Sequence, residues 1–387
     1  MKKGARKKII VSSIIIAVIL FVGVLIYNYS SFFEKKNVGM SPIEENIYSL
    51  TDQLISLNSG VQLASVEQQQ QKTAQMKDIA IKREMLMLQL AKENPNAFLD
   101  VVSKSVKLAT VPAEIQPYIE KSFSSTASVD VMIYDDFASN KSWNEYTLNL
   151  KGDTTTKYQT QKLEFYPTRD LNVISGTSVS LSGYKLQNVA VANVDKNLQV
   201  LSTPPLDSIG DQKTLVLLVD FLDSGERPFT KEQAQQMIFG VDSTFQKFYK
   251  ENSYGKVSFS GDVYGWYTLQ RSKDEGGHGV DNFDFDGSFQ IIAENNIDIS
   301  SYDRIIELVN PLYGVGGWSF IGKYEKTINN VEYRVSNAVV GVQFMPWGSS
   351  DNDRFMWNWE YGALIHEMGH SLGLLHASGW DCDNQVL

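Results

Sequence analysis

The chain has 387 residues, of which 43% are hydrophobic and 21% are charged, which is enough apolar material for two or three packed domains. Its formal net charge of −10 excludes a broad basic surface, so no nucleic-acid partner is expected. The single cysteine, Cys382, excludes a disulfide bond within the chain.

The N-terminus combines a basic flank with an uncharged stretch. Residues 1–8 carry five basic side chains and no acid, and residues 9–27 contain no charge. Nineteen such residues can cross about 30 Å of hydrocarbon as a helix. We therefore expect a cytoplasmic basic tail and a transmembrane signal anchor at 9–27, which places the rest of a single-pass cell-membrane protein outside. A cleaved signal peptide, and hence secretion, is the alternative.

Residues 28–124 are predicted to form a polar tether and a helical region. From residue 42 to residue 98, apolar side chains recur at spacings of three and four. Pro95 ends this pattern, because proline disfavours the helical backbone in the residue before it. A second short helix is expected over residues 96–108.

Strand periodicity replaces the helical pattern over residues 125–205. Apolar residues alternate along 129–134, and runs at 146–150 and 177–181 repeat this pattern between glycine-containing breaks. We predict a small β-rich domain here, either a β-sandwich or a barrel, followed by a linker at 201–205.

Residues 206–387 mix strand-like and helix-like segments and are predicted to form an α+β domain. Strands are expected at 214–221, 256–264, 303–310 and 331–344, and helices at 230–250, 288–296 and 359–372. Thr230 and Gln233 have the spacing of a capping box at the start of the first helix.

Three of the four histidines in the chain fall between residues 366 and 376. On a helix, residues four apart share a face, so His366 and His370 can bind one metal ion together. Gly373 can adopt the left-handed backbone that ends a helix, which lets the chain return His376 as a third nitrogen ligand. Three nitrogen ligands leave one position open for water, as in catalytic zinc sites. Ordinary surface or core histidines are the alternative.

Glu367 lies one residue round the helix from His366. In that position its carboxylate can reach a metal-bound water without being a ligand itself. It is therefore the candidate catalytic residue.

The sequence from His366 to His376 resembles the extended zinc signature of the metzincin peptidases. Residues 376–382, together with 253–256 and 265–266, are most similar to the gametolysin-like branch, and immune-inhibitor-A-type peptidases are a looser match. The resemblance covers about residues 213–387. It implies a zincin-like catalytic domain and a zinc metalloendopeptidase that hydrolyses protein or peptide substrates outside the membrane.

Such a peptidase uses Zn²⁺ to lower the pKa of a bound water and to polarise the scissile carbonyl. Glu367 would take the water proton as general base and pass it to the leaving amine. Residues 337–344 are a candidate strand edge along which an extended substrate pairs, and an ordinary core strand is the alternative.

Two features depart from the metzincin pattern. Metzincins place a methionine turn beneath the zinc, but none of the ten methionines here follows His376. We therefore expect the sequence to be a fragment, with little activity alone, whose Cys382 finds its partner in the missing part. Some metzincins block the zinc with a propeptide cysteine, and no cysteine precedes the histidines here.

Other candidate residues have weaker support. A calcium loop is one possibility, since its first half is matched by Asn282, Asp284, Asp286 and Gly287. Ala293 stands where a bidentate glutamate is needed, so a helix-start loop is favoured. His278 is expected in an exposed loop and Glu360 as a solvated charge. Trp357 and Trp359 are expected to pack against the last helix rather than to bind substrate.

The alternative function belongs to a different class. The chain would be a non-catalytic, membrane-anchored surface protein with an adhesion or scaffold role. Its zinc site would then be a relic or purely structural.

Overall fold

The computed structural model describes residues 40–61, 65–105, 108, 110–137, 139–150, 161–272, 285–310, 316–329, 331–342 and 362–376. The chain divides into two compact units, Met1–Leu86 and Met87–Leu387. The expected anchor at 9–27 lies outside the described residues. Within the described residues, no helix is both long enough and apolar enough to cross a membrane.

The predicted helical region forms α2 (Pro42–Val61), α3 (Val66–Glu93) and α4 (Pro95–Lys104). Within the first unit, the buried Arg83 of α3 donates from Nε to Oγ1 of Thr51 in α2 at 2.8 Å. The expected break at Pro95 is confirmed. Asn94 caps the new helix, because its Oδ1 accepts from the amide of Ala97 at 3.1 Å.

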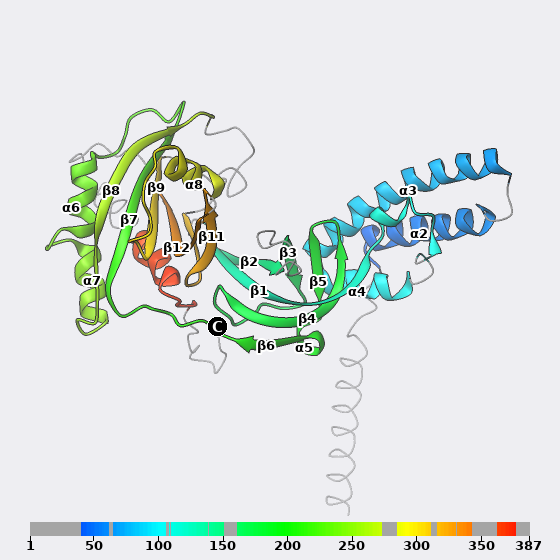
Figure 1. The fold of residues 1–387 in the computed structure, drawn as a ribbon, viewed down its shortest axis with the longest axis horizontal. Helices are drawn as coiled ribbons and strands as arrows, with labels where there is room; N and C mark the ends of the chain where they lie inside the picture. Colours follow the sequence, from blue (N-terminus) through cyan, green and yellow to red (C-terminus); the bar gives the residue numbers. More distant parts are fainter. Residues whose placement is uncertain are drawn as a thin grey trace, which may run out of the picture. The chain divides into compact units, whose positions relative to one another are not determined.

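Twelve strands of the second unit belong to one mixed sheet, so the unit is α+β as predicted (Figure 1). The strands are β1 (Lys121–Asp136), β2 (Lys141–Leu150), β3 (Gln161–Pro167), β4 (Thr177–Leu186), β5 (Val189–Ala192), β6 (Leu198–Ser202), β7 (Gly210–Phe221), β8 (Val257–Leu269), β9 (Arg304–Asn310), β10 (Gly317–Phe320), β11 (Tyr324–Ile328) and β12 (Val331–Gly341).

The first strands close into a small barrel, which is one of the two architectures predicted for this region. β1 pairs with β2, β2 with β3, β3 with β5, β5 with β4, and β4 again with β1. Val129, Val131 and Leu148 point into its core and are buried. β6 pairs with β4 and extends to Ser202, so the irregular connection begins later than the predicted linker.

The remaining strands form what we call the parallel half of the sheet. Its order is β8-β7-β9-β12-β10, with β10 antiparallel to its neighbour and the others parallel. The buried strands expected at 214–221 and 303–310 correspond to β7 and β9. β10 and β11 were not predicted, because strands of four and five residues carry little periodicity.

The prediction of a single helix over residues 230–250 is wrong about the number of helices. The segment forms two helices, α6 (Lys231–Phe239) and α7 (Thr244–Asn252), separated at Gly240. The capping box between Thr230 and Gln233 is present, and Ser243 caps the second helix through the amide of Gln246 at 3.0 Å. A second cap inside the segment is the reason why one helix becomes two.

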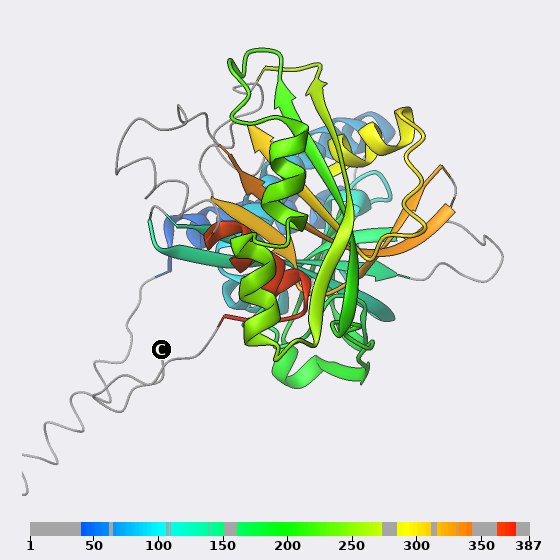
Figure 2. The ribbon, with the colours of Figure 1, turned by 90° about the vertical axis from the view of Figure 1, so that its left-hand side faces the viewer.

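Helices cover both faces of the parallel half (Figure 2). Val216 and Leu218 of β7 face α6, α7 and the helix at 362–371, whereas Leu215 and Leu217 face α8 (Phe285–Glu294). Because successive side chains of a strand point to opposite faces, this one apolar strand serves two cores. The helix at 362–371, which we call the histidine helix, is therefore packed directly against the sheet.

β1 belongs to both halves of the sheet. Its residues 121–129 pair with β4, and its residues 132–135 pair with β10 along the same edge. The buried Ser175 fills the gap, since its Oγ accepts from the amide of Val131 at 2.9 Å and donates to the carbonyl of the same residue at 3.0 Å. The barrel predicted as a separate domain is thus joined to the parallel half by one continuous strand.

Asp130 of β1 provides a test of packing in the barrel. Burial raises the pKa of Asp130 to about 6, although Asn149 Nδ2 donates to its carboxylate at 2.6 Å. The folded-state pKa therefore lies above the unfolded value, so the charged form costs stability above pH 6, and this cost vanishes below about pH 4. A shift of about two pKa units corresponds to about 3 kcal/mol.

We expect Asp130→Asn to raise the free energy of unfolding by up to about 3 kcal/mol at pH 8. The gain should disappear between pH 6 and pH 4, where the native carboxyl is protonated. Urea unfolding at several pH values measures this, and a gain that does not change with pH would contradict the argument.

Candidate metal centre

The histidine helix ends as the sequence predicts. Gly373 has a φ of +95°, the left-handed backbone that a glycine adopts without steric cost. The amide of Gly373 donates to the carbonyl of His370 at 2.7 Å, and the amide of Leu374 donates to the carbonyl of Gly369 at 3.0 Å. This is the double hydrogen bond of a Schellman motif, and it turns the chain back towards the helix.

Buried polar groups fix the end of the histidine helix to the sheet. Arg304 of β9 is fully buried and donates to the carbonyl of Ser371, to Oε1 of Gln212 at 2.9 Å and to Oγ of Ser336 at 3.0 Å. Burial lowers the pKa of Arg304 to about 10, so the guanidinium stays charged at neutral pH. A positive charge at a helix C-terminus is favourable.

The turn brings the three predicted histidines together with one acid. His366, His370, His376 and Asp135 each offer one ligand atom, and these atoms all lie within 4.8 Å of one another. Nε2 of His366 lies 3.1 Å from Nε2 of His370 and 3.2 Å from Nε2 of His376. The carboxylate of Asp135 lies 3.2 Å, 3.4 Å and 3.0 Å from the three rings in sequence order.

These distances fit a cation better than they fit hydrogen bonds. An imidazole nitrogen carries one proton or one lone pair, so Nε2 of His366 cannot form a good hydrogen bond with three polar neighbours at once. A tetrahedral ion with ligands at about 2.0–2.1 Å has ligand–ligand separations of about 3.3–3.4 Å, close to those observed. The cluster could therefore hold a metal ion with three nitrogens and a carboxylate.

Contacts behind the ligand atoms orient the rings. Nδ1 of His370 lies 2.7 Å from the carbonyl of Leu374, to which it can only donate, so Nε2 is left with its lone pair towards the cluster. Nδ1 of His376 lies 3.4 Å from Oγ of Ser142, and the ring of Phe137 meets His366 edge-on at 5.2 Å.

Asp135 is the ligand that the sequence did not reveal. It lies on β1, within the region expected to be separate from the catalytic domain, and no spacing links it to residues 366–376. Burial raises its pKa, but contacts with His366, His370 and His376 outweigh this and hold the pKa of Asp135 below its usual range. The carboxylate in turn raises the pKa of His376.

Glu367 lies next to the cluster but is not part of it. It is fully buried, and neither carboxylate oxygen has a hydrogen-bond partner. Burial raises the pKa of Glu367 well above its usual value, and the negative charge of Asp135 adds to this. A Cβ on Gly317 of β10 would lie 2.6 Å from Cγ of Glu367, so only a glycine there leaves room for this side chain.

The strand edge at the site is not the one expected. The predicted segment at 337–344 falls largely on β12, which pairs with β9 on one side and with β10 on the other. It is therefore a core strand, the alternative left open by the sequence. β10 is the strand beside Glu367, and β1 pairs with its outer edge.

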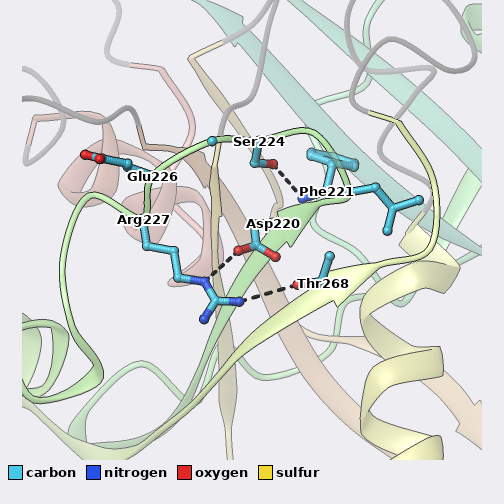
Figure 3. Close-up of a pocket in the computed structure, with 8 residues that line it drawn as sticks. Asp220, Phe221, Ser224, Glu226, Arg227 and Thr268 are labelled. Carbon is cyan, nitrogen blue, oxygen red and sulfur yellow. Dashed lines mark hydrogen bonds and ion pairs between the residues drawn. The ribbon is translucent and has the colours of Figure 1, made fainter.

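A hollow that no histidine lines lies between the end of β7 and β8 (Figure 3). Arg227 pairs with Asp220 at 2.7 Å and also contacts Thr268 (Figure 3). The ion pair occupies one oxygen of the only acid buried there, so this hollow offers no comparable ligand set among the described residues.

Several weaker candidates lie outside the described residues. These are His278, the possible calcium ligands Asn282 and Asp284, the aromatic and acidic residues Trp357, Trp359 and Glu360, and Cys382. Asp286 and Gly287 belong to α8, but their side chains are not described.

Comparison with models of known protein families gave no match, and a search of curated proteins gave none either. Only the residues of the site and the motif they form therefore indicate a function.

Metal binding is the most direct test of the cluster. The purified chain should contain roughly one zinc ion, because four protein ligands form a complete tetrahedral set. His370→Ala should lose it, whereas Glu367→Gln should keep it, since Glu367 is not a ligand. Elemental analysis after gel filtration measures the zinc content of each protein. Full zinc retention in His370→Ala would show that His370 is not a metal ligand.

The anchor at Arg304 provides a second test. Arg304→Met leaves several buried acceptors unpaired, and charged hydrogen bonds contribute about 1.5–3 kcal/mol each, so we expect a loss of at least about 3 kcal/mol. Arg169→Met is the control, because its ion pair with Asp195 is exposed on both sides and is worth about 0–1 kcal/mol. Urea unfolding of both variants measures this, and equal effects would contradict the anchoring role.

Proposed function

We propose that the chain is a zinc-dependent endopeptidase that hydrolyses protein substrates outside the membrane. The observation that carries this proposal is the convergence of three imidazole nitrogens and a carboxylate within 4.8 Å of one another, next to the buried carboxylate of Glu367. The order of the histidines and the turn at Gly373 support the resemblance to metzincins.

Zinc is the metal that best suits this donor set. Imidazole and carboxylate ligands in a four-coordinate, near-tetrahedral arrangement are typical of Zn²⁺. When bound, the ion would supply Lewis acidity towards a peptide carbonyl and towards water. His366, His370 and His376 would hold it, and the carbonyl of Leu374 would keep the ring of His370 in the required tautomer.

Glu367 would act as the general base. Its position supports this role, because the carboxylate is buried beside the cluster without being part of it. It would take a proton from the attacking water and deliver it to the leaving amine. β10 would bind the substrate backbone, since it is the strand beside Glu367.

The location outside the membrane rests on the N-terminal sequence. The basic residues at 1–8 and the uncharged span at 9–27 favour a signal anchor with an exported remainder. A chain that starts near residue 31 in the medium would instead show a cleaved signal peptide.

The second candidate is a non-catalytic surface protein with a structural metal. One observation favours it, because a closed set of four protein ligands is typical of structural zinc. Glu367 argues against it. A buried carboxylate without a partner destabilises the fold, and a purely structural site has no use for it.

Hydrolysis should be measured in the Asp135→Ala background, where the metal has an open position, after limited proteolysis of the exposed connection at 203–209, which allows β1 to leave the outer edge of β10. We expect zinc-dependent cleavage of unfolded protein or of a fluorogenic peptide mixture. Adding Glu367→Gln should lower the rate by about 10²–10⁴-fold without loss of zinc, because general-base catalysis is typically worth that much. If both zinc-loaded proteins cleave at the same rate, Glu367 is not the base and the peptidase mechanism is lost.

A further inference from the structure

The hairpin of β1 and β2 reaches the metal centre at three points. Asp135 contacts all three histidines, Phe137 lies edge-on to the ring of His366, and Ser142 lies beside Nδ1 of His376. We infer that this hairpin is an internal inhibitor, in which Asp135 fills the fourth metal position and β1 covers the substrate edge. The inference rests on the proposed function.

Asp135 occupies the position that the catalytic chemistry needs. Three nitrogens come from the histidine helix and its turn. The fourth ligand is the carboxylate, whose Oδ2 lies 3.2 Å from His366 and 3.4 Å from His370 and whose Oδ1 lies 3.0 Å from His376. A catalytic zinc site keeps this position for water or for the substrate carbonyl. With Asp135 in place, the metal presents a closed set and cannot take either.

β1 also occupies the strand edge beside the site. Residues Met132–Asp135 run antiparallel to Gly317–Phe320 of β10, and Asp135 stands directly opposite Gly317. The other edge of β10 is held by β12. A peptide substrate would need the edge that β1 now uses, because an extended chain binds a sheet through the free groups of an outer strand.

The hairpin has more strand pairing with the barrel than with β10 beside the metal centre, so it would move with the barrel. β1 pairs with β2 over residues 127–136 and with β4 over residues 121–129, but with β10 over only four residues. Withdrawal breaks the short ladder, the Asp135 contacts and the packing of Tyr134 against Trp318, and it leaves the barrel intact. The connection at 203–209 between β6 and β7 is largely exposed and has no helix or strand, so a protease could cut it and free the barrel.

The chain offers a matched pair of variants for a test. Asp135→Asn and Asp136→Asn each remove one negative charge and keep the side-chain shape. Asp136 follows Asp135 and therefore points to the other face of the strand. In the turn its carboxylate accepts from the amide of Ser139 at 3.1 Å and from Oγ of Ser139 at 2.5 Å, and an asparagine oxygen can keep the first of these bonds.

The experiment uses the full chain loaded with Co²⁺ and the small chelator acetohydroxamate, with the visible absorption of cobalt as the readout. It needs no peptide hydrolysis, so it can succeed even if the peptidase proposal fails. The native chain and Asp136→Asn should respond weakly. Asp135→Asn should bind the chelator with a dissociation constant at least tenfold lower, because a neutral amide oxygen is a poorer ligand than a carboxylate.

Three results would overturn the inference. Equal chelator affinity in the native chain and in Asp135→Asn would show that Asp135 does not block the metal. An equal gain in Asp136→Asn would show only a general charge effect. Loss of cobalt from Asp135→Asn would show that the carboxylate is required to hold the ion, as in a structural site.

Discussion

Three imidazole nitrogens and a carboxylate converge at separations of 3.0–3.4 Å, and the rest of the second unit is arranged around this convergence. Lone pairs and a negative charge this close repel one another unless a cation lies among them. With a cation, the same groups attract it together. The cluster then links Asp135 of the barrel to the histidine helix of the parallel half, and the metal becomes a contact between two parts of the fold.

The long strand β1 connects the same two parts of the fold through its backbone. One end closes the barrel through β4, and the other end extends the parallel half through β10. Ser175 spans the point where the partner changes, so the strand keeps its hydrogen bonds on that edge without a gap. The position of Asp135 is therefore set by a strand that pairs with both the barrel and the parallel half.

Features set by short spacing could be predicted from the sequence, whereas features set by long-range pairing could not. The histidine ligands, the turn at Gly373 and the capping box at Thr230 each depend on residues within a few positions of one another. Asp135 depends on a pairing between β1 and β10, and β10 is too short to show periodicity. The sequence also left open whether the β-rich region is a barrel or a sandwich, because only the pairing of its strands decides between the two.

The number of ligands alone would assign this centre to structural zinc, but the source of each ligand supports a different assignment. Three ligands come from one helix and its turn, which Arg304 holds rigidly to the sheet, so these three are preorganised without the fourth. The fourth comes from a hairpin that makes only a short ladder with that sheet. Glu367 remains buried and unpartnered beside it, at a cost to stability. A costly buried acid and a separable fourth group are features that the proposed catalytic centre, held closed, would have and that a structural site would not need.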